Sequence, residues 1–181
     1  MKVTVFLADG FELVEAMCPI DLLRRAGAVV TTVSISDSLT VASANGVSVL
    51  ADTTLAAIDP TLPDLVFLPG GMPGSANLRA CDAVCQIVLD TNRNGGFVAA
   101  ICAAPFILGE LGLLAGREAI CYPGFEDKLS GATLSKHKVI RDGNIITAAG
   151  MGVALPFAAA LVEALYGKEK ADEVLTAVIA V

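Results

Sequence analysis

Basic residues are scarce in this chain of 181 residues, where 12 Lys and Arg stand against 19 Asp and Glu, a formal net charge of −7. A protein this acidic is poorly suited to phosphate backbones or anionic lipid, so we expect neither nucleic-acid nor membrane binding. Charged residues make up only 17% of the chain and hydrophobic residues 55%, which excludes a disordered chain. The length suits a single domain over residues 1–181.

Histidine is almost absent, and the cysteines are widely spaced. The one histidine, His137, lies between two lysines in a polar segment, where we expect an exposed side chain without a catalytic role. No two cysteines are separated by two residues, so the ligand pattern of a zinc site is missing and no metal is expected. The five cysteines are an odd number, and in a reducing cytoplasm, where we place the protein, free thiols are expected.

Long apolar runs that would span a membrane are also missing. The stretch from Gly143 to Val162 has no charged residue, but Gly150, Gly152 and Pro156 interrupt it. A strand, a glycine turn and a buried helix explain this stretch better than a membrane span does. The apolar run before Asp9 is too short for the core of a signal peptide and predicts a first strand.

Short apolar runs rich in β-branched residues alternate with helical patterns along the chain. Strands are expected at Val3–Ala8, Val29–Ser34, Leu65–Leu68, Phe97–Ile101, Ile120–Tyr122, Lys138–Ile140 and Ile145–Thr147, with a hairpin at Val41–Leu50. Helices are expected up to Arg25, around Asp82–Asn92, from about Ala104 to Leu111, and at Val153–Tyr166 and Ala171–Ala180. This alternation predicts an α/β sandwich with a mostly parallel sheet and helices on both faces. Ligands in such folds bind where the strands end, so the strand-to-helix junctions are the places to search.

One junction carries a cysteine. The strand that ends at Ile101 runs directly into Cys102, and Pro105 opens the next helix. A nucleophile on such a tight turn projects from the sheet edge, and the helix N-terminus is expected to lower the pKa of its thiol. The alternative is that Cys102 is a small buried hydrophobic residue, as many cysteines are.

Two more junctions lie upstream. Leu68 is followed by Pro69, Gly70 and Gly71, a turn that lets backbone N–H groups approach a ligand. The N–H groups of Gly71 and Ala103 could together bind an oxyanion, whereas a simple chain reversal explains the glycines equally well.

The remaining junction places Glu12 and Glu15 at a helix start, with Pro19 four residues after Glu15. A partly desolvated Glu15 would have a raised pKa and could share a proton with a thiolate. From the pattern alone, a solvated glutamate that suits the helix dipole is the simpler interpretation. Pro19 is expected to disturb the helix at the Glu15 carbonyl.

Four segments together resemble the ThiJ/PfpI superfamily, and its ThiJ branch in particular. They are Asp9–Glu15, Pro19–Gly27, Asp64–Gly71 and Ala100–Pro105, and Gly150–Gly152 with the helix after it also fits. The resemblance implies a flavodoxin-like fold, of the kind found in class I glutamine amidotransferases, and a homodimer. It also implies that Cys102 is the nucleophile and Glu15 its protonated hydrogen-bond partner. Gly71 and Ala103 would supply the oxyanion hole.

The activity implied by this resemblance is cofactor-independent chemistry on small α-oxoaldehydes such as methylglyoxal, or on their protein adducts. The alternative is a non-enzymatic redox sensor in which the cysteine is oxidised. An amidase or protease is disfavoured, because Ala103 takes the place of the histidine that follows the nucleophile in such members. Many relatives also have a histidine where this chain has Tyr122. A phenol does not shuttle protons at neutral pH, but it can orient a carbonyl group.

The other cysteines have weaker patterns. Cys81 and Cys85 are four residues apart on one expected helix face, and they are interpreted as core or interface thiols. Cys18 and Cys121 could act as resolving thiols, but packing is the simpler role for both.

Overall fold

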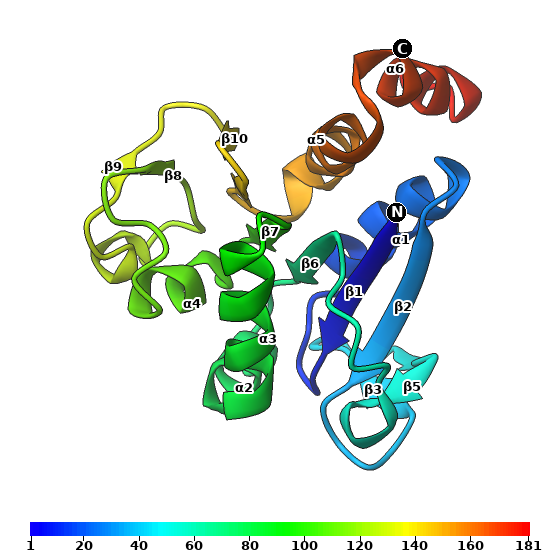
Figure 1. The fold of residues 1–181 in the computed structure, drawn as a ribbon, viewed down its shortest axis with the longest axis vertical. Coiled ribbons are helices and arrows are strands. Elements are labelled where there is room, and N and C mark those ends of the chain that lie inside the picture. Colours follow the sequence, from blue (N-terminus) through cyan, green and yellow to red (C-terminus); the bar gives the residue numbers. More distant parts are fainter.

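A seven-stranded sheet runs through the centre of the computed structural model, which describes all 181 residues (Figure 1). Its order is β10-β11-β7-β6-β1-β2-β5, and only the edge pair β10–β11 is antiparallel. The strands are β1 (Lys2–Leu7), β2 (Val29–Ser34), β5 (Thr53–Thr54), β6 (Leu65–Leu68), β7 (Phe97–Ile101), β10 (Val139–Asp142) and β11 (Ile145–Ala148). The segment β2-β1-β6-β7-β11 has the strand order of a flavodoxin-like fold, so the predicted fold class is confirmed.

Helices cover both faces of this sheet. One layer holds α1 (Leu13–Arg25), α5 (Ala154–Tyr166) and α6 (Lys168–Ala177), and the other holds α2 (Gly74–Ala80), α3 (Asp82–Arg93) and α4 (Pro105–Glu110) (Figure 1). Successive side chains of a strand point to opposite faces, so the buried strands must be apolar on both. In β6, Leu65 and Phe67 join the core under α1 and α5, while Val66 and Leu68 join the core under α3 and α4.

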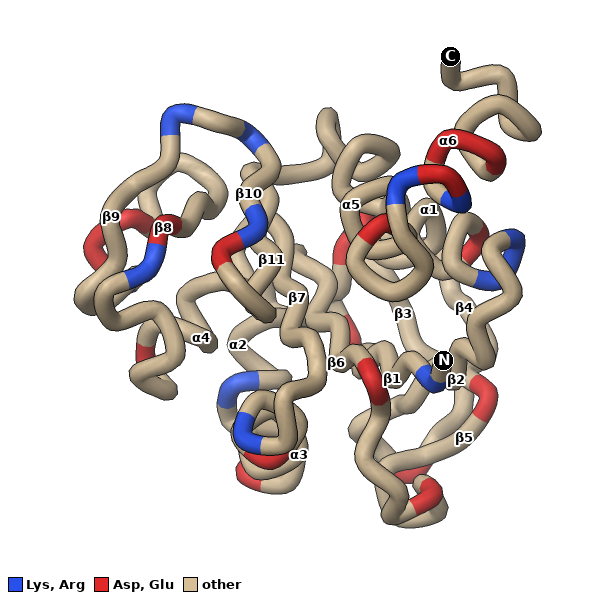
Figure 2. The backbone as a smooth tube through the Cα atoms, turned by 45° about the horizontal axis from the view of Figure 1, so that its top comes forward, with Lys and Arg blue, Asp and Glu red and all other residues tan.

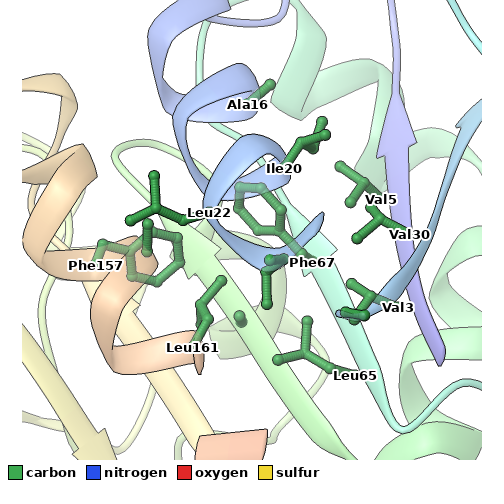
Figure 3. Packing of buried hydrophobic residues seen from close by; sticks show 14 of the residues in the cluster. Val3, Val5, Ala16, Ile20, Leu22, Val30, Leu65, Phe67, Phe157 and Leu161 are labelled. Atoms are coloured by element: carbon green, nitrogen blue, oxygen red, sulfur yellow. The ribbon is translucent and has the colours of Figure 1, made fainter. Parts of the chain in front are cut away.

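The larger core lies between the sheet, α1 and α5 (Figure 3). The rings of Phe67 and Phe157 are tilted against each other, with their centroids 5.5 Å apart. Ile20 from α1 and Leu161 from α5 belong to the same cluster. This packing fixes α1, the helix that carries Glu15, against the sheet.

Short elements complete the chain. The predicted hairpin is present as β3 (Thr40–Ala42) and β4 (Ser48–Leu50), and a small parallel pair is formed by β8 (Glu118–Ala119) and β9 (Thr133–Leu134). Three 3-10 turns are η1 (Leu55–Ala57), η2 (Glu126–Lys128) and η3 (Met151–Val153). None of the helices is both long enough and apolar enough to cross a bilayer.

Two local predictions are wrong. The strand expected at Ile120–Tyr122 is absent, because these residues bridge to the end of the main sheet: the Ile120 N–H donates to Thr147 Oγ1 at 3.0 Å. Helix α2 was not predicted, since its sequence contains Gly74, Ser75 and Asn77, which have low helix propensity.

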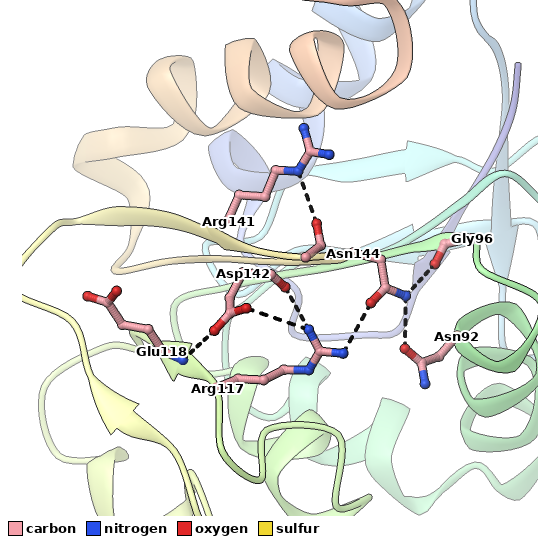
Figure 4. A network of polar contacts seen from close by, with 8 residues as sticks. Asn92, Gly96, Arg117, Glu118, Arg141, Asp142 and Asn144 are labelled. Atoms are coloured by element: carbon pink, nitrogen blue, oxygen red, sulfur yellow. Dashed lines mark hydrogen bonds and ion pairs between the residues drawn. The ribbon is translucent and has the colours of Figure 1, made fainter.

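A polar network attaches β8 to the main sheet (Figure 4). The Arg117 guanidinium donates to the Asp142 carbonyl at 2.8 Å and to Asn144 Oδ1 at 3.3 Å. Asn144 in turn donates to the carbonyl of Gly96 at 2.8 Å, at the start of β7. The segment that follows β8 and contains Tyr122 is therefore held in place from its N-terminal side.

Candidate active site

Three loops meet where β1, β6 and β7 end. The chain leaves β1 for β2 on one side of the sheet and enters β6 on the other, so a crevice opens between β1 and β6. Ligand sites of open α/β sheets lie at such a switch point. The loops bring together Glu15, Gly70, Gly71, Cys102 and Ala103.

Cys102 lies on a strained turn between β7 and α4. Its φ angle is +64°, in the left-handed region that non-glycine residues rarely adopt. Two hydrogen bonds hold its backbone there: its N–H donates to the Ala148 carbonyl at 2.9 Å, and its carbonyl accepts from the Tyr122 N–H at 2.7 Å. The turn leaves the side chain half-buried at the edge of the sheet.

The two glycines after β6 have different reasons to be glycine. A Cβ at Gly70 would collide with Glu15 Oε2 and with Cys102. Gly71 has a φ angle of +89°, and a Cβ there would collide with the loop before α1. Gly70 therefore allows the carboxyl and the sulfur to approach each other, while Gly71 turns the backbone toward them.

Glu15 is fixed in the first turn of α1. Glu12 caps this helix, with its side chain accepting from the Glu15 N–H at 2.7 Å, and the Glu12 N–H donates to the Gly70 carbonyl at 2.9 Å. Only 1% of Glu15 is exposed, so the solvated interpretation is wrong. The disturbance expected from Pro19 does not end the helix, which continues to Arg25.

The Glu15 carboxyl is held in a buried position with little to stabilise its charge. Its Oε2 atom is buried beside Gly70 and Cys102, and no hydrogen bond reaches it. Burial raises the pKa of Glu15 from 4.5 to about 7, against the Cys102 thiol and the backbone N–H groups of Gly70 and Met151, which lower it, and with a smaller contribution from the charge of Glu12. The sequence left this environment open, and the structure shows that Glu15 is a carboxyl that changes its protonation near neutral pH.

The expected lowering of the thiol pKa is wrong. Burial and the facing Glu15 carboxylate raise the pKa of Cys102 from 9.0 to about 12, although the backbone N–H groups of Gly71 and Ala103 act in the opposite direction. The N-terminus of α4 directly follows Cys102 in the sequence, so its effect on the thiol pKa could be predicted. The Glu15 carboxyl comes from a distant part of the chain, so its opposite effect could not. Above pH 7 the two side chains therefore hold one proton between them, and below it they hold two.

A hollow of about 410 Å³ lies next to this pair. We call it the Tyr122 hollow; its lining includes Tyr122, Lys138, Gly150 and Met151. Tyr122 is half exposed, and a Cβ on Gly150 would lie 3.4 Å from its ring and 3.8 Å from Glu15 Oε1. Lys138 was not predicted from the sequence, although the glycines after β11 mark one more strand end at the same edge of the sheet.

The remaining candidates lie elsewhere. His137 is exposed in the segment before β10, as expected.

Cys81 is not on a helix face with Cys85, because it is the residue that separates α2 from α3. Cys85 is buried in α3, and its thiol donates to the Arg79 carbonyl at 3.3 Å. Burial raises the pKa of Cys121 to about 11, and Cys18 packs partly against the larger core.

Fold and site together define a flavodoxin-like protein with a cysteine on a strained turn and a buried carboxyl facing it. A model of the DJ-1/PfpI family matches residues 1–164, and the chain belongs to that family.

Its relatives include Protein DJ-1 homolog B of Arabidopsis thaliana, 43% identical over 175 residues that cover 96% of this chain. The chain spans 40% and 45% of the length of the two Arabidopsis relatives. The Glutathione-independent glyoxalase DJR-1.2 of Caenorhabditis elegans is 31% identical over 92% of this chain and 89% of its own. The structure of oxidized Toxoplasma gondii DJ-1 is 36% identical, with a TM-score of 0.94 over 98% of this chain and 97% of that one.

The raised pKa of Glu15 makes stability depend on pH in a defined direction. The folded state retains the Glu15 proton up to about pH 7, whereas the unfolded chain loses it near 4.5. The contribution of this proton to stability is complete below pH 4.5 and is lost as the pH rises to 7. As the pH is raised from 4.5 to 8, we expect the free energy of unfolding of Glu15→Gln to increase by about 3 kcal/mol relative to that of the wild type, as measured by urea denaturation.

Cys102→Ala is the matched control, because burial raises the pKa of Glu15 whereas the hydrogen bond from the Cys102 thiol lowers it, so removal of the thiol leaves the cause of the shift in place. This variant should keep most of the wild-type pH dependence. A constant difference between Glu15→Gln and the wild type over this range would show that Glu15 ionises normally.

Proposed function

We propose that this chain is a cofactor-independent enzyme in which Cys102 attacks the aldehyde of small α-oxoaldehydes such as methylglyoxal, or of their protein adducts. The observation that carries this proposal is the buried pair formed by Glu15 and Cys102, which shares one proton near neutral pH. Proton transfer at neutral pH is most efficient for a group whose pKa lies near 7. A family member described as a glutathione-independent glyoxalase supports the same chemistry.

The first step is addition of the thiol to the aldehyde. Glu15 takes the thiol proton as the sulfur bonds to the aldehyde carbon, and it returns this proton to the carbonyl oxygen, which yields a hemithioacetal. Such a base activates a thiol whose own pKa is about 12. The backbone N–H groups of Gly71 and Ala103 face the sulfur, and they would stabilise the developing oxyanion.

The second step moves a hydrogen between two carbons. Glu15 removes the proton from the former aldehyde carbon to form an enediol, and it delivers a proton to the neighbouring carbon. The first carbon is oxidised to a thioester and the second is reduced to an alcohol, so no external oxidant is needed. Water then hydrolyses the thioester, which releases the hydroxy acid and the free Cys102 thiol. Tyr122, at the wall beside Glu15, would orient the second carbonyl by hydrogen bonding.

A redox role for the same cysteine is the second candidate. One close structural relative, from Toxoplasma gondii, is described as oxidized. In this chain the N–H groups of Gly71 and Ala103 and the Glu15 carboxyl would hold an oxidised Cys102 sulfur. An amidase or protease mechanism lacks the histidine of a Cys–His pair, because the residue after Cys102 is Ala103 and His137 is exposed on another segment.

Activity should depend on both members of the pair and on pH. We expect kcat/KM for methylglyoxal to rise with pH through about 7, because Glu15 must lose its proton before it can accept one from the thiol. Cys102→Ala should abolish turnover, and Glu15→Gln should lower kcat/KM by about 10²–10⁴-fold and remove the pH dependence. Tyr122→Phe should lower it by about ten- to a hundredfold. Lactate formation without glutathione is the measurement.

His137→Ala is the control, and it should retain wild-type activity because this side chain is exposed on the segment before β10. Absence of turnover by the folded wild type would reject the enzyme and favour the redox role. Oxidation of Cys102 by mild peroxide, followed by peptide mass spectrometry, would then measure that role.

We further propose that the chain acts as a homodimer in the cytoplasm, where its five free thiols would stay reduced. The β3–β4 hairpin exposes apolar side chains, with Leu50 at 73% and Val47 at 47%. Apolar surface of this kind is typical of an interface. Light scattering should give twice the chain mass of 18.5 kDa. Leu50→Glu should shift the mass toward one chain, and a wild-type monomer at micromolar concentration would contradict the dimer.

A further inference from the structure

The Tyr122 hollow has one charged residue in its lining. Seven of its eight lining residues are uncharged and mainly apolar, and the eighth is Lys138. The Lys138 side chain is exposed and forms no ion pair with any carboxylate. A cation at the rim of an apolar hollow is available to an anionic ligand.

The surroundings of Lys138 are basic in a chain that is acidic as a whole. The segment between β9 and β10 contains Lys136 and Lys138 and no acidic residue; in Figure 2 this segment carries blue but no red. The chain carries a formal net charge of −7, so this segment departs from the average surface. A local positive potential attracts anions and repels cations near the hollow.

Gly150 lies in the wall between the hollow and the reactive pair. A Cβ at this position would lie 3.4 Å from the Tyr122 ring and 3.8 Å from Glu15 Oε1. Because Gly150 has no side chain, only its backbone lies between the hollow and the Glu15 carboxyl. Lys138 is attached to the same wall, because the Ala149 N–H donates to its carbonyl at 2.8 Å. The opposite wall leads to the nucleophile, because the N–H of Tyr122, which lines the hollow, donates to the Cys102 carbonyl at 2.7 Å.

We propose that Lys138 determines specificity by binding a carboxylate on the substrate, at the end remote from the reacting aldehyde. This inference rests on the proposed function and predicts that, among α-oxoaldehydes, those that carry a carboxylate are the preferred substrates. A single lysine compensates the single charge of a carboxylate, whereas the two charges of a phosphate would leave one unpaired. The apolar lining formed by Pro123, Met151 and Val153 suits the short carbon chain between the two ends.

The first test does not depend on turnover. Iodoacetate and iodoacetamide alkylate the same thiol, but only iodoacetate is an anion, so the ratio of their rates at Cys102 measures attraction of a carboxylate. We expect Lys138→Gln to lower this ratio about fivefold, as measured by peptide mass spectrometry. Lys136→Gln makes the same charge change two residues away, outside the hollow, and should alter the ratio by less than about 1.5-fold. Equal effects of the two variants, or no effect of either, would overturn the proposal.

The second test compares two substrates, methylglyoxal, which is neutral, and 4,5-dioxopentanoate, which carries a carboxylate. In Lys138→Gln the kcat/KM for 4,5-dioxopentanoate should fall about tenfold relative to that for methylglyoxal, mainly through KM. Lys138→Arg should restore the wild-type ratio, and Lys136→Gln should leave it unchanged. An unchanged ratio in Lys138→Gln would reject the specificity role of Lys138 and leave the proposed enzymatic function in place. Failure of the wild type to convert either substrate, with the alkylation ratio as expected, would reject the proposed function and retain the carboxylate site.

Discussion

The other features of the site depend on one contact, the burial of the Glu15 carboxyl against the Cys102 sulfur. Water is excluded from the carboxyl, and no hydrogen bond compensates its Oε2 atom. An ionised carboxyl is unfavourable in such a place, so the proton is retained up to about pH 7. The same burial places the carboxyl against the Cys102 thiol, whose pKa is also raised. Together the two groups form a proton-sharing pair.

The fold provides this arrangement at a topological switch point. Helix α1 brings Glu15 in from the β1 side, and the strained turn after β7 brings Cys102 in from the other. Between them, Gly70 supplies the one backbone position at which both can approach. The left-handed turn at Cys102 is unfavourable by itself, and the two hydrogen bonds of its backbone hold it. Packing of α1 and α5 over the sheet keeps the carboxyl from moving into solvent.

Much of the sheet could be predicted from local pattern, because β6 and β7 are short apolar runs and β2 is rich in β-branched residues. The position of Cys102 followed from the same reasoning, since the end of β7 and Pro105 both lie next to it. The state of Glu15 did not follow, because a glutamate at a helix start suits the dipole whether or not it is buried. Its burial depends on Gly70, which is distant in sequence, and the raised thiol pKa depends on Glu15 in turn. The bridging segment at Tyr122 was missed for the same reason, since its partners, Thr147 and Cys102, are non-local.

The most direct test of this account is the protonation state of Glu15 itself. Infrared difference spectra between the wild type and Glu15→Gln isolate the C=O stretch of the protonated carboxyl, which can be followed as the pH is raised. The account predicts that this band persists through pH 6 and is lost with a midpoint of about 7. It also predicts that the band survives in Cys102→Ala, because burial is the main cause of the shift. Loss of the band with a midpoint near 4.5, the ordinary value for this carboxyl, would contradict it.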